Sequence, residues 1–228
     1  MAADAIPRTG HVPASQRSDK LLEVTQLHLW RGDRHLLKGI QFRVDAGQLL
    51  QLLWPNGLGK TSLLRCIAGF LHAEAGQVLW QGQPIRDRHG FHRALAYLGH
   101  ETALKDDLTA VENLRFACAL RVPHDTGVLR AALAAVGLQD IDPALPVRAF
   151  SAGQKRRVAL ARLSLWDAQL WLLDEPATNL DAAGQAVFER ILSAHIAGGG
   201  AAIMATHRRI ELAGVDSRCW LSPQEPLQ

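Results

Sequence analysis

The segment from residue 49 to residue 67 constrains this chain more than any other part of it. An apolar run, Leu49 to Leu53, is followed by a turn and then by a helical pattern. The turn ends in Gly59, Lys60 and Thr61, which match the last three positions of the pattern G-x-x-x-x-G-K-[ST]. In a strand–turn–helix of this kind, backbone N–H groups surround a phosphate, the lysine contacts the β- and γ-phosphates, and the hydroxyl binds Mg²⁺. The segment therefore predicts a phosphate-binding loop.

Two positions in this loop depart from the expected pattern. Trp54 occupies the first position, where the conformational freedom of glycine normally sets the turn. Leu58 stands between two glycines, where a small residue is usual. If either bulky side chain crowded the phosphate, the site would be weakened, and Trp54→Gly would raise nucleotide affinity. Alternatively, both side chains point away and the loop still binds nucleotide.

A second feature is an apolar run that ends in two carboxylates. Leu170 to Leu173 has the composition of a buried strand, and Asp174 and Glu175 follow it directly. An aspartate at such a strand end is placed to hold Mg²⁺, directly or through water. The neighbouring glutamate would act as general base on the attacking water. An acidic pair alone would indicate only a solvated loop, but the phosphate-binding loop upstream favours the catalytic interpretation.

Three further motifs narrow the class of protein. Residues 150–154, Phe-Ser-Ala-Gly-Gln, precede a basic helix start and resemble the L-S-G-G-Q signature of ABC transporter ATPases, with alanine in the third place. Residues 179–181, Asn-Leu-Asp, follow the carboxylates as the D-loop of that family does. His207, just after the apolar run 201–205, matches the family's switch histidine. The motifs also occur in the family's order along the chain.

The resemblance extends over residues 21–221 and implies the α/β fold of that family, a P-loop NTPase core with a parallel sheet and an inserted helical lobe. It further implies a homodimer in which ATP lies between the phosphate-binding loop of one copy and Ser151 and Gly153 of the other. His207 would donate to the γ-phosphate and sense its loss. Trp30 resembles the aromatic residue that stacks on adenine in this family, with a core tryptophan as the alternative interpretation.

The resemblance assigns site residues by position. ATP binding is expected at Trp30, Pro55, Asn56, Gly57, Leu58, Gly59, Lys60, Thr61, Ser62, His100, Ser151, Gly153, Gln154 and Asp181. Mg²⁺ is expected at Thr61 and Asp174, and catalysis at Lys60, Glu175 and His207. His100 stands where most members have the glutamine that lies near Mg²⁺ and the surface coupled to the membrane subunit.

Within the family, three stretches resemble the heme-exporter ATP-binding subunits of cytochrome c maturation, namely 31–34, 97–114 and 151–162. This likeness implies integral membrane subunits of that type as partners, and a peripheral position on the cytoplasmic side of the bacterial inner membrane. The function implied is heme export or release of a heme chaperone, although no C-x-x-C-H motif occurs in the chain. The alternatives are the ATPase subunit of another ABC exporter, and a weakly active nucleotide-binding scaffold.

Composition excludes several other classes. The 25 basic and 22 acidic residues leave a net charge too small to indicate a nucleic-acid partner, so a soluble ABC protein acting on DNA or ribosomes is disfavoured. The three cysteines form neither a disulfide framework nor a metal pair. No apolar run approaches the roughly 18 residues that span a bilayer. The first twenty residues lack the apolar segment of a signal peptide.

The length of 228 residues suits one domain. We expect residues 1–20 to form a flexible tail and residues 21–228 a single ABC ATPase domain. Residues 73–147 mix short strand-like pieces with helical stretches and are interpreted as a mostly helical section inserted into the α/β core. Within the ATPase domain we expect the helical lobe at about 100–165. Elsewhere strands alternate with helices, which predicts a parallel sheet with helices on both faces.

Overall fold

The computed structural model describes residues 20–87, 90–119, 121–223 and 227, so residues 1–19 of the expected tail lie outside the described part. The elements are β1 (Lys20–Arg31), β2 (Arg34–Asp45), β3 (Gln48–Leu52), α1 (Lys60–Ile67), β4 (Ala75–Trp80), β5 (Gln83–Pro84), η2 (Ile85–Asp87), α2 (Phe91–Ala94), β6 (Leu95–Leu98), α3 (Ala110–Ala119), α4 (Thr126–Ala135), η3 (Val147–Ala149), α5 (Ala152–Leu165), β7 (Leu170–Asp174), α6 (Ala182–Ala197), β8 (Ala201–Ala205) and β9 (Asp216–Trp220).

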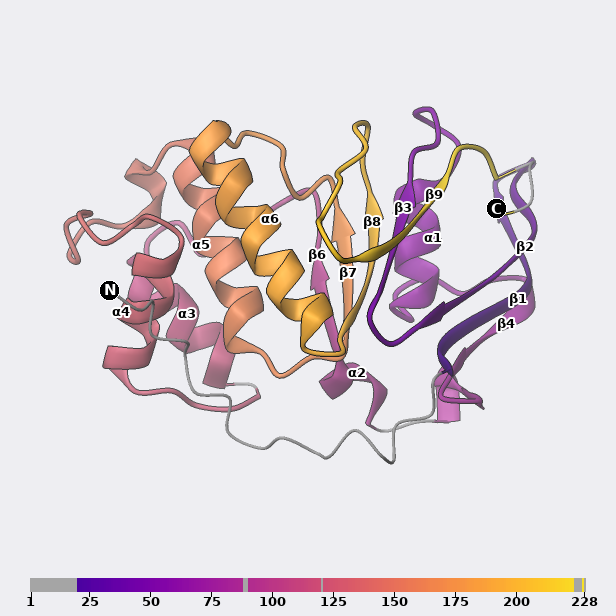
Figure 1. The fold of residues 1–228 in the computed structure, drawn as a ribbon, viewed down its shortest axis with the longest axis horizontal. Coiled ribbons are helices and arrows are strands. Elements are labelled where there is room, and N and C mark those ends of the chain that lie inside the picture. The colour runs from indigo at the N-terminus through magenta and orange to yellow at the C-terminus, as the bar shows by residue number, and fades with distance from the viewer. Residues whose placement is uncertain (1–19, 88–89, 120, 224–226, 228) are drawn as a thin grey trace.

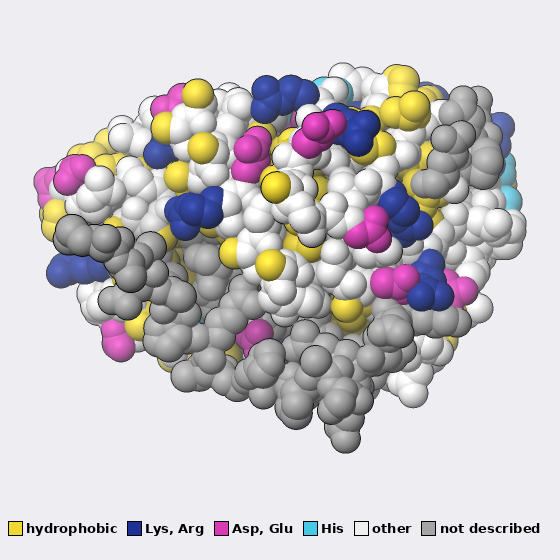
Figure 2. All heavy atoms as spheres, in the orientation of Figure 1, with side chains coloured by type: hydrophobic (Ala, Val, Ile, Leu, Met, Phe, Trp, Pro, Cys, Tyr) yellow, Lys and Arg dark blue, Asp and Glu magenta, His cyan; other side chains and the backbone are white. Residues whose placement is uncertain are grey.

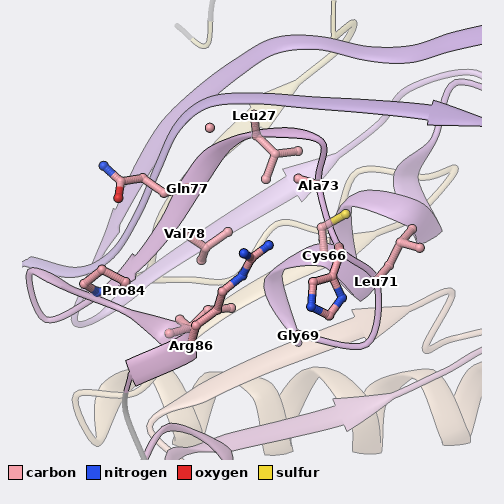
Figure 3. A pocket seen from close by; sticks show the side chains of 12 residues that line it. Leu27, Cys66, Gly69, Leu71, Ala73, Gln77, Val78, Pro84 and Arg86 are labelled. Atoms are coloured by element: carbon pink, nitrogen blue, oxygen red, sulfur yellow. The ribbon is translucent and has the colours of Figure 1, made fainter.

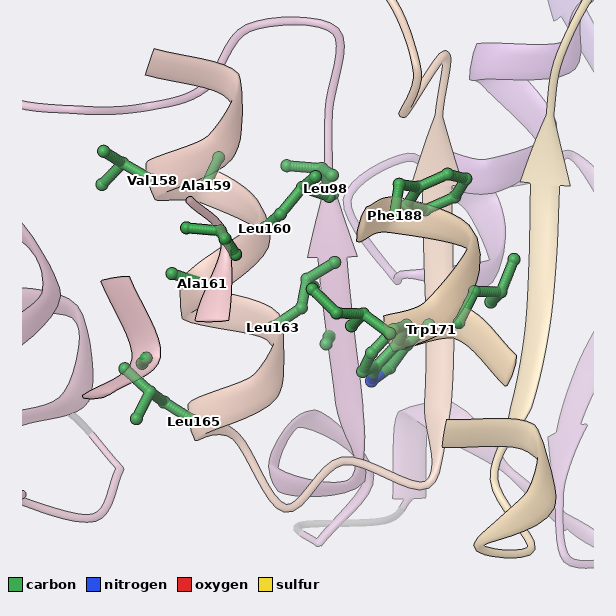
Figure 4. Close-up of a cluster of buried hydrophobic side chains, with 14 of the residues drawn as sticks. Leu98, Val158, Ala159, Leu160, Ala161, Leu163, Leu165, Trp171 and Phe188 are labelled. Carbon is green, nitrogen blue, oxygen red and sulfur yellow. The ribbon is translucent and has the colours of Figure 1, made fainter. Parts of the chain in front are cut away.

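A parallel sheet forms the centre of the molecule (Figure 1). Its strands have the order β6-β7-β8-β3-β9, and each neighbouring pair is parallel. Successive side chains of β7 enter different cores. Leu170 and Leu172 belong to the core that contains α1, whereas Trp171 and Leu173 pack towards α5 and α6 (Figure 4). A strand covered on both faces is a nearly continuous apolar run, and the predicted parallel sheet with helices on both faces is confirmed.

A second sheet, which the sequence pattern does not predict, is antiparallel and has the order β2-β1-β4-β5. Its inner face and α1 enclose a core that includes Leu22, Val24 and Leu63. The interpretation of residues 73–147 as a mostly helical section is corrected for its first part. Strands β4 and β5 belong to the antiparallel sheet, and β6 belongs to the parallel sheet. These short strands are stabilised by pairing with β1 and β7, which lie far away in the sequence.

Helices α3, α4 and α5 pack on one another at the end of the molecule that lies to the left in Figure 1. They fall within the range 100–165 expected for the helical lobe. Helix α5 begins with a capping box, in which Ser151 Oγ accepts from the N–H of Gln154 and Gln154 Oε1 accepts from the N–H of Ser151. The helix ends at Leu165, and the backbone of the next residue, Trp166, is extended.

The order of the strands determines where the predicted site residues meet. Because β7, β8 and β3 are adjacent and parallel, the loops that follow them lie at one edge of the sheet. The phosphate-binding loop follows β3, Asp174 and Glu175 lie at the end of β7, and His207 follows β8. Helices α5 and α6 begin at the same edge, which is uppermost in Figure 1.

Charged side chains of both signs lie near one another on the face in Figure 2, and the basic side chains drawn there form no continuous band. This distribution agrees with the near balance of basic and acidic residues in the sequence. Among the helices in the described part of the chain, none combines the length and the apolar character that crossing a membrane requires.

Candidate nucleotide site

The phosphate-binding loop joins the end of β3 to α1. Gly57 and Gly59 lie in the left-handed region with φ of 77° and 97°, and a Cβ on Gly59 would approach Leu37 to 2.9 Å. The backbone angle therefore favours glycine at Gly59, and the neighbouring leucine side chains leave little room for a larger residue. Gly59 is also the N-cap of α1 and provides no side-chain acceptor. The first N–H groups of this helix are thus left for an anion rather than for a cap.

Trp54 lies beneath the loop and does not enter it. Its side chain is fully buried and meets Trp220 of β9 edge to face, with ring centroids 5.0 Å apart. Its backbone is outside the left-handed region, so this conformation does not need glycine. Leu58 is half-buried and packs against the same core. The geometry favours the alternative in which both side chains point away from the phosphate.

Lys60 is held at the centre of the loop. It is 6% exposed, and its Nζ donates to the carbonyl oxygen of Trp54 at 2.6 Å. Burial lowers the pKa of this ammonium, and the charges of Glu175 and Asp174 offset part of that effect. The lysine charge is therefore near enough to the two carboxylates at the end of β7 to be stabilised by them.

Glu175 and His207 form a pair beside this loop. Asp174 is buried as the last residue of β7, and Glu175 follows with a left-handed backbone, φ 51°. Such backbone strain in a residue other than glycine is typical of functional sites. Glu175 Oε1 lies 2.9 Å from His207 Nε2, with side chains 19% and 55% exposed respectively. The structure thus brings together the three residues predicted for catalysis.

The segment after His207 is held by a residue that the sequence analysis misses. Gln51 of β3 is fully buried. Its amide donates to the carbonyl oxygen of Ile210 at 2.7 Å and accepts from the N–H of Ile210 at 2.9 Å. It also donates to Ser217 Oγ at 2.8 Å. The signal available in the sequence was a single polar residue within the apolar run 49–53.

The signature residues lie apart from the phosphate-binding loop and its lysine. Ser151, Gly153 and Gln154 line a hollow of about 750 Å³ together with residues of the D-loop, and no residue of the phosphate-binding loop lines it. A Cβ on Gly153 would come within 2.8 Å of the carbonyl oxygen of Asn179, so the signature and the D-loop are in close contact at this glycine. The structure therefore divides the predicted ATP-binding residues into two sets on one chain.

Asp181 is the N-cap of α6 and borders the same hollow. Its Oδ1 accepts from the N–H of Gly184 at 2.8 Å and from Arg157 Nη2 at 2.6 Å. These two donors, the N–H first, lower the pKa of the carboxyl. Arg157 also donates to the carbonyl oxygen of Val136 at 3.2 Å. Arg157, whose contacts the sequence does not predict, thereby links the signature helix to the D-loop and to the end of α4.

Trp30 is an exposed aromatic platform. Its side chain is 39% exposed, which contradicts the alternative of a core tryptophan. The ring stacks on His35 of β2 with centroids 3.7 Å apart and planes 8° from parallel. His28 Nδ1 lies 3.0 Å from His35 Nε2, so the two histidines support the platform by a shared hydrogen bond. One face of the indole is covered in this way.

The remaining predicted residues lie on the loops and the first turn of α1. Pro55 and Asn56 are exposed, and Thr61 and Ser62 are half-buried. His100 is exposed on the loop after β6, next to the end of β7. Its carbonyl oxygen accepts from Arg156, a buried residue of α5 that the sequence analysis treats only as part of a basic helix start.

The donor set fits Mg²⁺ and ATP. Thr61 and Asp174 offer hard oxygen ligands, and Mg²⁺ characteristically takes one or two such protein ligands together with phosphate oxygens. No group of three or more His, Cys, Asp or Glu side chains suited to a metal occurs in the part of the chain that the structure describes. The uncapped start of α1 and the narrow space at Gly59 suit a phosphate held by backbone N–H groups.

A separate cavity of about 280 Å³ lies between the end of α1 and the β4–β5–η2 region (Figure 3). Its lining includes Leu27, Cys66, Val78 and Arg86, and none of the predicted site residues. This cavity is distinct from both sets of ATP-binding residues.

Comparisons with known proteins agree with this arrangement. The family model described as ABC transporter matches residues 37–178. The chain is 49% identical over 198 residues to the cytochrome c biogenesis ATP-binding export protein CcmA of Aromatoleum aromaticum, covering 84% of this chain and 91% of that protein. It is 47% identical over 189 residues to CcmA 2 of Salmonella paratyphi A, covering 82% and 90%. A solved ATP-binding subunit of an ABC transporter superposes with a TM-score of 0.74 at 26% identity, over 82% of this chain and 79% of that one.

Residues 37–178, which the family model matches, include the phosphate-binding loop, the signature and the carboxylate pair. The predicted P-loop NTPase fold and the predicted resemblance are therefore confirmed. The chain belongs to the ABC transporter family and, within it, to the cytochrome c biogenesis ATP-binding export proteins.

Proposed function

We propose that this chain is the ATP-hydrolysing subunit of an ABC exporter in cytochrome c maturation, where it powers heme export or the release of a heme chaperone. The main support is the meeting of Lys60, Glu175 and His207 at one edge of the parallel sheet. A second support is the 49% identity of this chain to a cytochrome c biogenesis ATP-binding export protein.

In the proposed reaction, the loop N–H groups and Lys60 bind the β- and γ-phosphates of ATP. Glu175 accepts a proton from the attacking water, whose oxygen forms the new bond to the γ-phosphorus while the bond to the ADP oxygen breaks. His207 donates a hydrogen bond to the γ-phosphate. Mg²⁺ at Thr61 and Asp174 would supply positive charge for the phosphate oxygens. The products are ADP and inorganic phosphate.

The proposed active form is a homodimer. One chain contains both a phosphate-binding loop and a signature, in separate places, so neither can complete a site on the same chain. In the dimer, ATP on the loop of one copy faces Ser151, Gly153 and Gln154 of the other. The indole of Trp30 stacks on the adenine with the face that His35 leaves uncovered.

The proposed partners are integral membrane subunits of the cytochrome c maturation type, with this chain bound on the cytoplasmic side of the inner membrane. The ATPase cycle would open and close the dimer against these subunits. His100, exposed beside the end of β7, would lie close to that contact.

ATP hydrolysis by the full-length chain, purified alone and with its membrane subunits, tests the enzymatic part. Glu175→Gln is expected to lower kcat by about 10²- to 10⁴-fold, because it removes the general base. Glu211→Gln, a change on the exposed surface after His207, is the matched control and should retain the wild-type rate. Equal rates for the wild type and Glu175→Gln would reject the assigned mechanism.

Formation of c-type cytochromes tests the transport part. Cells that lack the chain should regain heme-stained cytochromes with the wild type and not with Glu175→Gln. A wild type that hydrolyses ATP but restores no cytochrome would instead support the ATPase of a different exporter. A chain that binds nucleotide and hydrolyses none, even with its membrane subunits, would support the scaffold alternative.

A further inference from the structure

Arg156 of α5 occupies an unusual position for an arginine. It is 2% exposed and lies one turn beyond the signature serine at the start of the helix. Its guanidinium donates hydrogen bonds to five backbone carbonyl oxygens, which belong to the loop after β6 and to the end of β7 with the loop that follows it. The acceptors are Gly99 at 2.9 Å, His100 at 3.3 Å, Asp174 at 3.0 Å, Glu175 at 2.6 Å and Pro176 at 2.9 Å.

The electrostatic state of this side chain suits the role of a fixed donor. Burial lowers the pKa of Arg156 to about 10, and the nearby carboxylate of Asp174 opposes that shift. The guanidinium is therefore still charged at neutral pH. A buried charge is costly unless its donors are satisfied, and here the planar fork is satisfied by backbone oxygens. The contacts thus hold the loops in one arrangement relative to α5.

One of these loops holds the backbone of the proposed general base. Glu175 has a left-handed backbone, φ 51°, and such strain persists only where the surroundings impose it. Its N–H donates to the carbonyl oxygen of Ala205 at 2.9 Å, and its carbonyl oxygen accepts from Arg156. The peptide that precedes and the peptide that follows Glu175 are therefore both fixed. On this fixed backbone the carboxylate of Glu175 lies 2.9 Å from His207 Nε2.

The other loop is the one after β6. Arg156 Nη1 binds the carbonyl oxygens of Gly99 and His100, whereas Nη2 binds those of Asp174 and Glu175. One rigid side chain therefore joins three segments: the signature helix, the His100 loop and the strand end that contains the carboxylates. A displacement of α5 or of the His100 loop must therefore move this guanidinium or break some of its hydrogen bonds.

We propose that Arg156 is a positioning residue for ATP hydrolysis, which holds Glu175 in its working geometry and makes that geometry depend on the signature helix and the His100 loop. The inference rests on the proposed ATPase function of this chain. Arg156 acts through the backbone of Glu175 and does not contact the nucleotide. A lysine cannot replace it, because an ammonium lacks the planar fork that spans the two loops.

The helix offers a matched control. Arg162 also lies on the buried side of α5, at 9% exposure, but its guanidinium lies over the ring of Trp166. Arg156→Lys and Arg162→Lys therefore remove a buried guanidinium from the same helix, and only the first change affects the two loops. Both are expected to lower the thermal unfolding temperature.

The test compares kcat, ATP affinity and unfolding temperature of the full-length chain in these variants. Arg156→Lys is expected to lower kcat about 10-fold or more with ATP affinity changed by less than about 2-fold, since the interaction is used in the transition state. Arg162→Lys should keep kcat within about 2-fold of the wild type. Equal loss of kcat in both variants would overturn the proposal, because the effect would then follow from stability alone.

A double-mutant cycle with Glu175→Gln separates positioning from general damage. If Arg156 acts through Glu175, Arg156→Lys should have little further effect on the residual single-turnover rate of Glu175→Gln. Losses that multiply would overturn the proposal. Arg156→Gln provides the same comparison if Arg156→Lys does not fold. A wild type without hydrolysis would refute the ATPase function itself, whereas an active wild type with an equally active Arg156→Lys would refute only the role of Arg156.

Discussion

The two helix starts that would face ATP in the proposed dimer are built in opposite ways. Helix α1 begins at Gly59, which has no side chain to accept from the first N–H groups. Helix α5 begins at Ser151, whose hydroxyl oxygen and the Gln154 amide satisfy each other's backbone. Helices α4 and α6 are also capped by side chains, those of Asp125 and Asp181. Among these four helices, α1 alone is left for an external anion to complete.

This difference indicates a division of labour between the two sets of site residues. The start of α1, with the buried charge of Lys60, is suited to bind phosphate without a second chain. The start of α5 is already satisfied, but the hydroxyl hydrogen of Ser151 and the amide N–H groups of Gln154 are additional donors. We therefore expect affinity for ATP to depend on α1, and closure of the dimer on α5.

The largest effect on stability is expected for Trp54, which lies beneath the phosphate-binding loop that leads into α1. Trp54→Ala removes a fully buried indole from contact with Trp220 and should cost about 3–5 kcal/mol of unfolding free energy. Urea unfolding at equilibrium measures this loss, and Trp54→Phe should retain most of the stability. A Trp54→Gly protein that is stable and binds ATP more tightly would restore the crowding alternative and contradict the buried position of this side chain.

Removing the charge of Lys60 should weaken ATP binding without lowering the unfolding free energy. Lys60→Met is expected to weaken ATP binding by about 2–3 kcal/mol, roughly 30- to 150-fold, because charge-assisted bonds to phosphate are lost. The unfolding free energy should not fall, since burial already disfavours the ammonium. Equilibrium nucleotide binding and urea unfolding check both parts. Lys155→Met, which removes a lysine paired with Asp106, is the control expected to bind ATP normally.

A smaller effect is expected at the start of α5. Ser151→Ala should cost about 1 kcal/mol of unfolding free energy through loss of the cap, and should leave the ATP affinity of the single chain unchanged. In the Glu175→Gln background it should weaken ATP-dependent dimerisation, measured by sedimentation. Asp125→Ala removes the comparable cap of α4 and should leave the dimer intact. If Ser151→Ala and Asp125→Ala weaken the dimer equally, the start of α5 has no special role in closing the dimer.

The smallest effect concerns pH and the cap of α6. The pKa of Asp181 is lowered below its ordinary value of 3.8 by the N–H of Gly184 and by Arg157. Its stabilising contribution is therefore complete above that value and is lost as pH falls through the folded pKa. Urea midpoints measured from about pH 5 to about pH 2.5 should fall less in Asp181→Asn than in the wild type. Identical pH profiles would show that the cap is not charge-assisted.

Much of the fold was accessible from local patterns. Apolar runs such as 170–173 and 201–205 are strands because both faces of the central sheet are covered, and a continuous apolar run is the signal of that environment. Strand β9 was not predicted, because Asp216–Trp220 has mixed polarity and forms a strand only through its pairing with β3. The antiparallel sheet was not predicted as a sheet, because the pairing of β4 with β1 joins segments that lie far apart in the sequence.

The sequence by itself determined the family and the chemistry proposed for this protein, because glycine, lysine, carboxylates and histidine occur together in the order that this chemistry requires. Only the tertiary structure decided which groups hold that chemistry in place. Trp54 lies beneath the loop, and Arg156 is buried among carbonyl oxygens from segments about 20 to 60 residues away along the chain. Burial and hydrogen bonding between distant segments arise from packing, and no local pattern in the sequence specifies them.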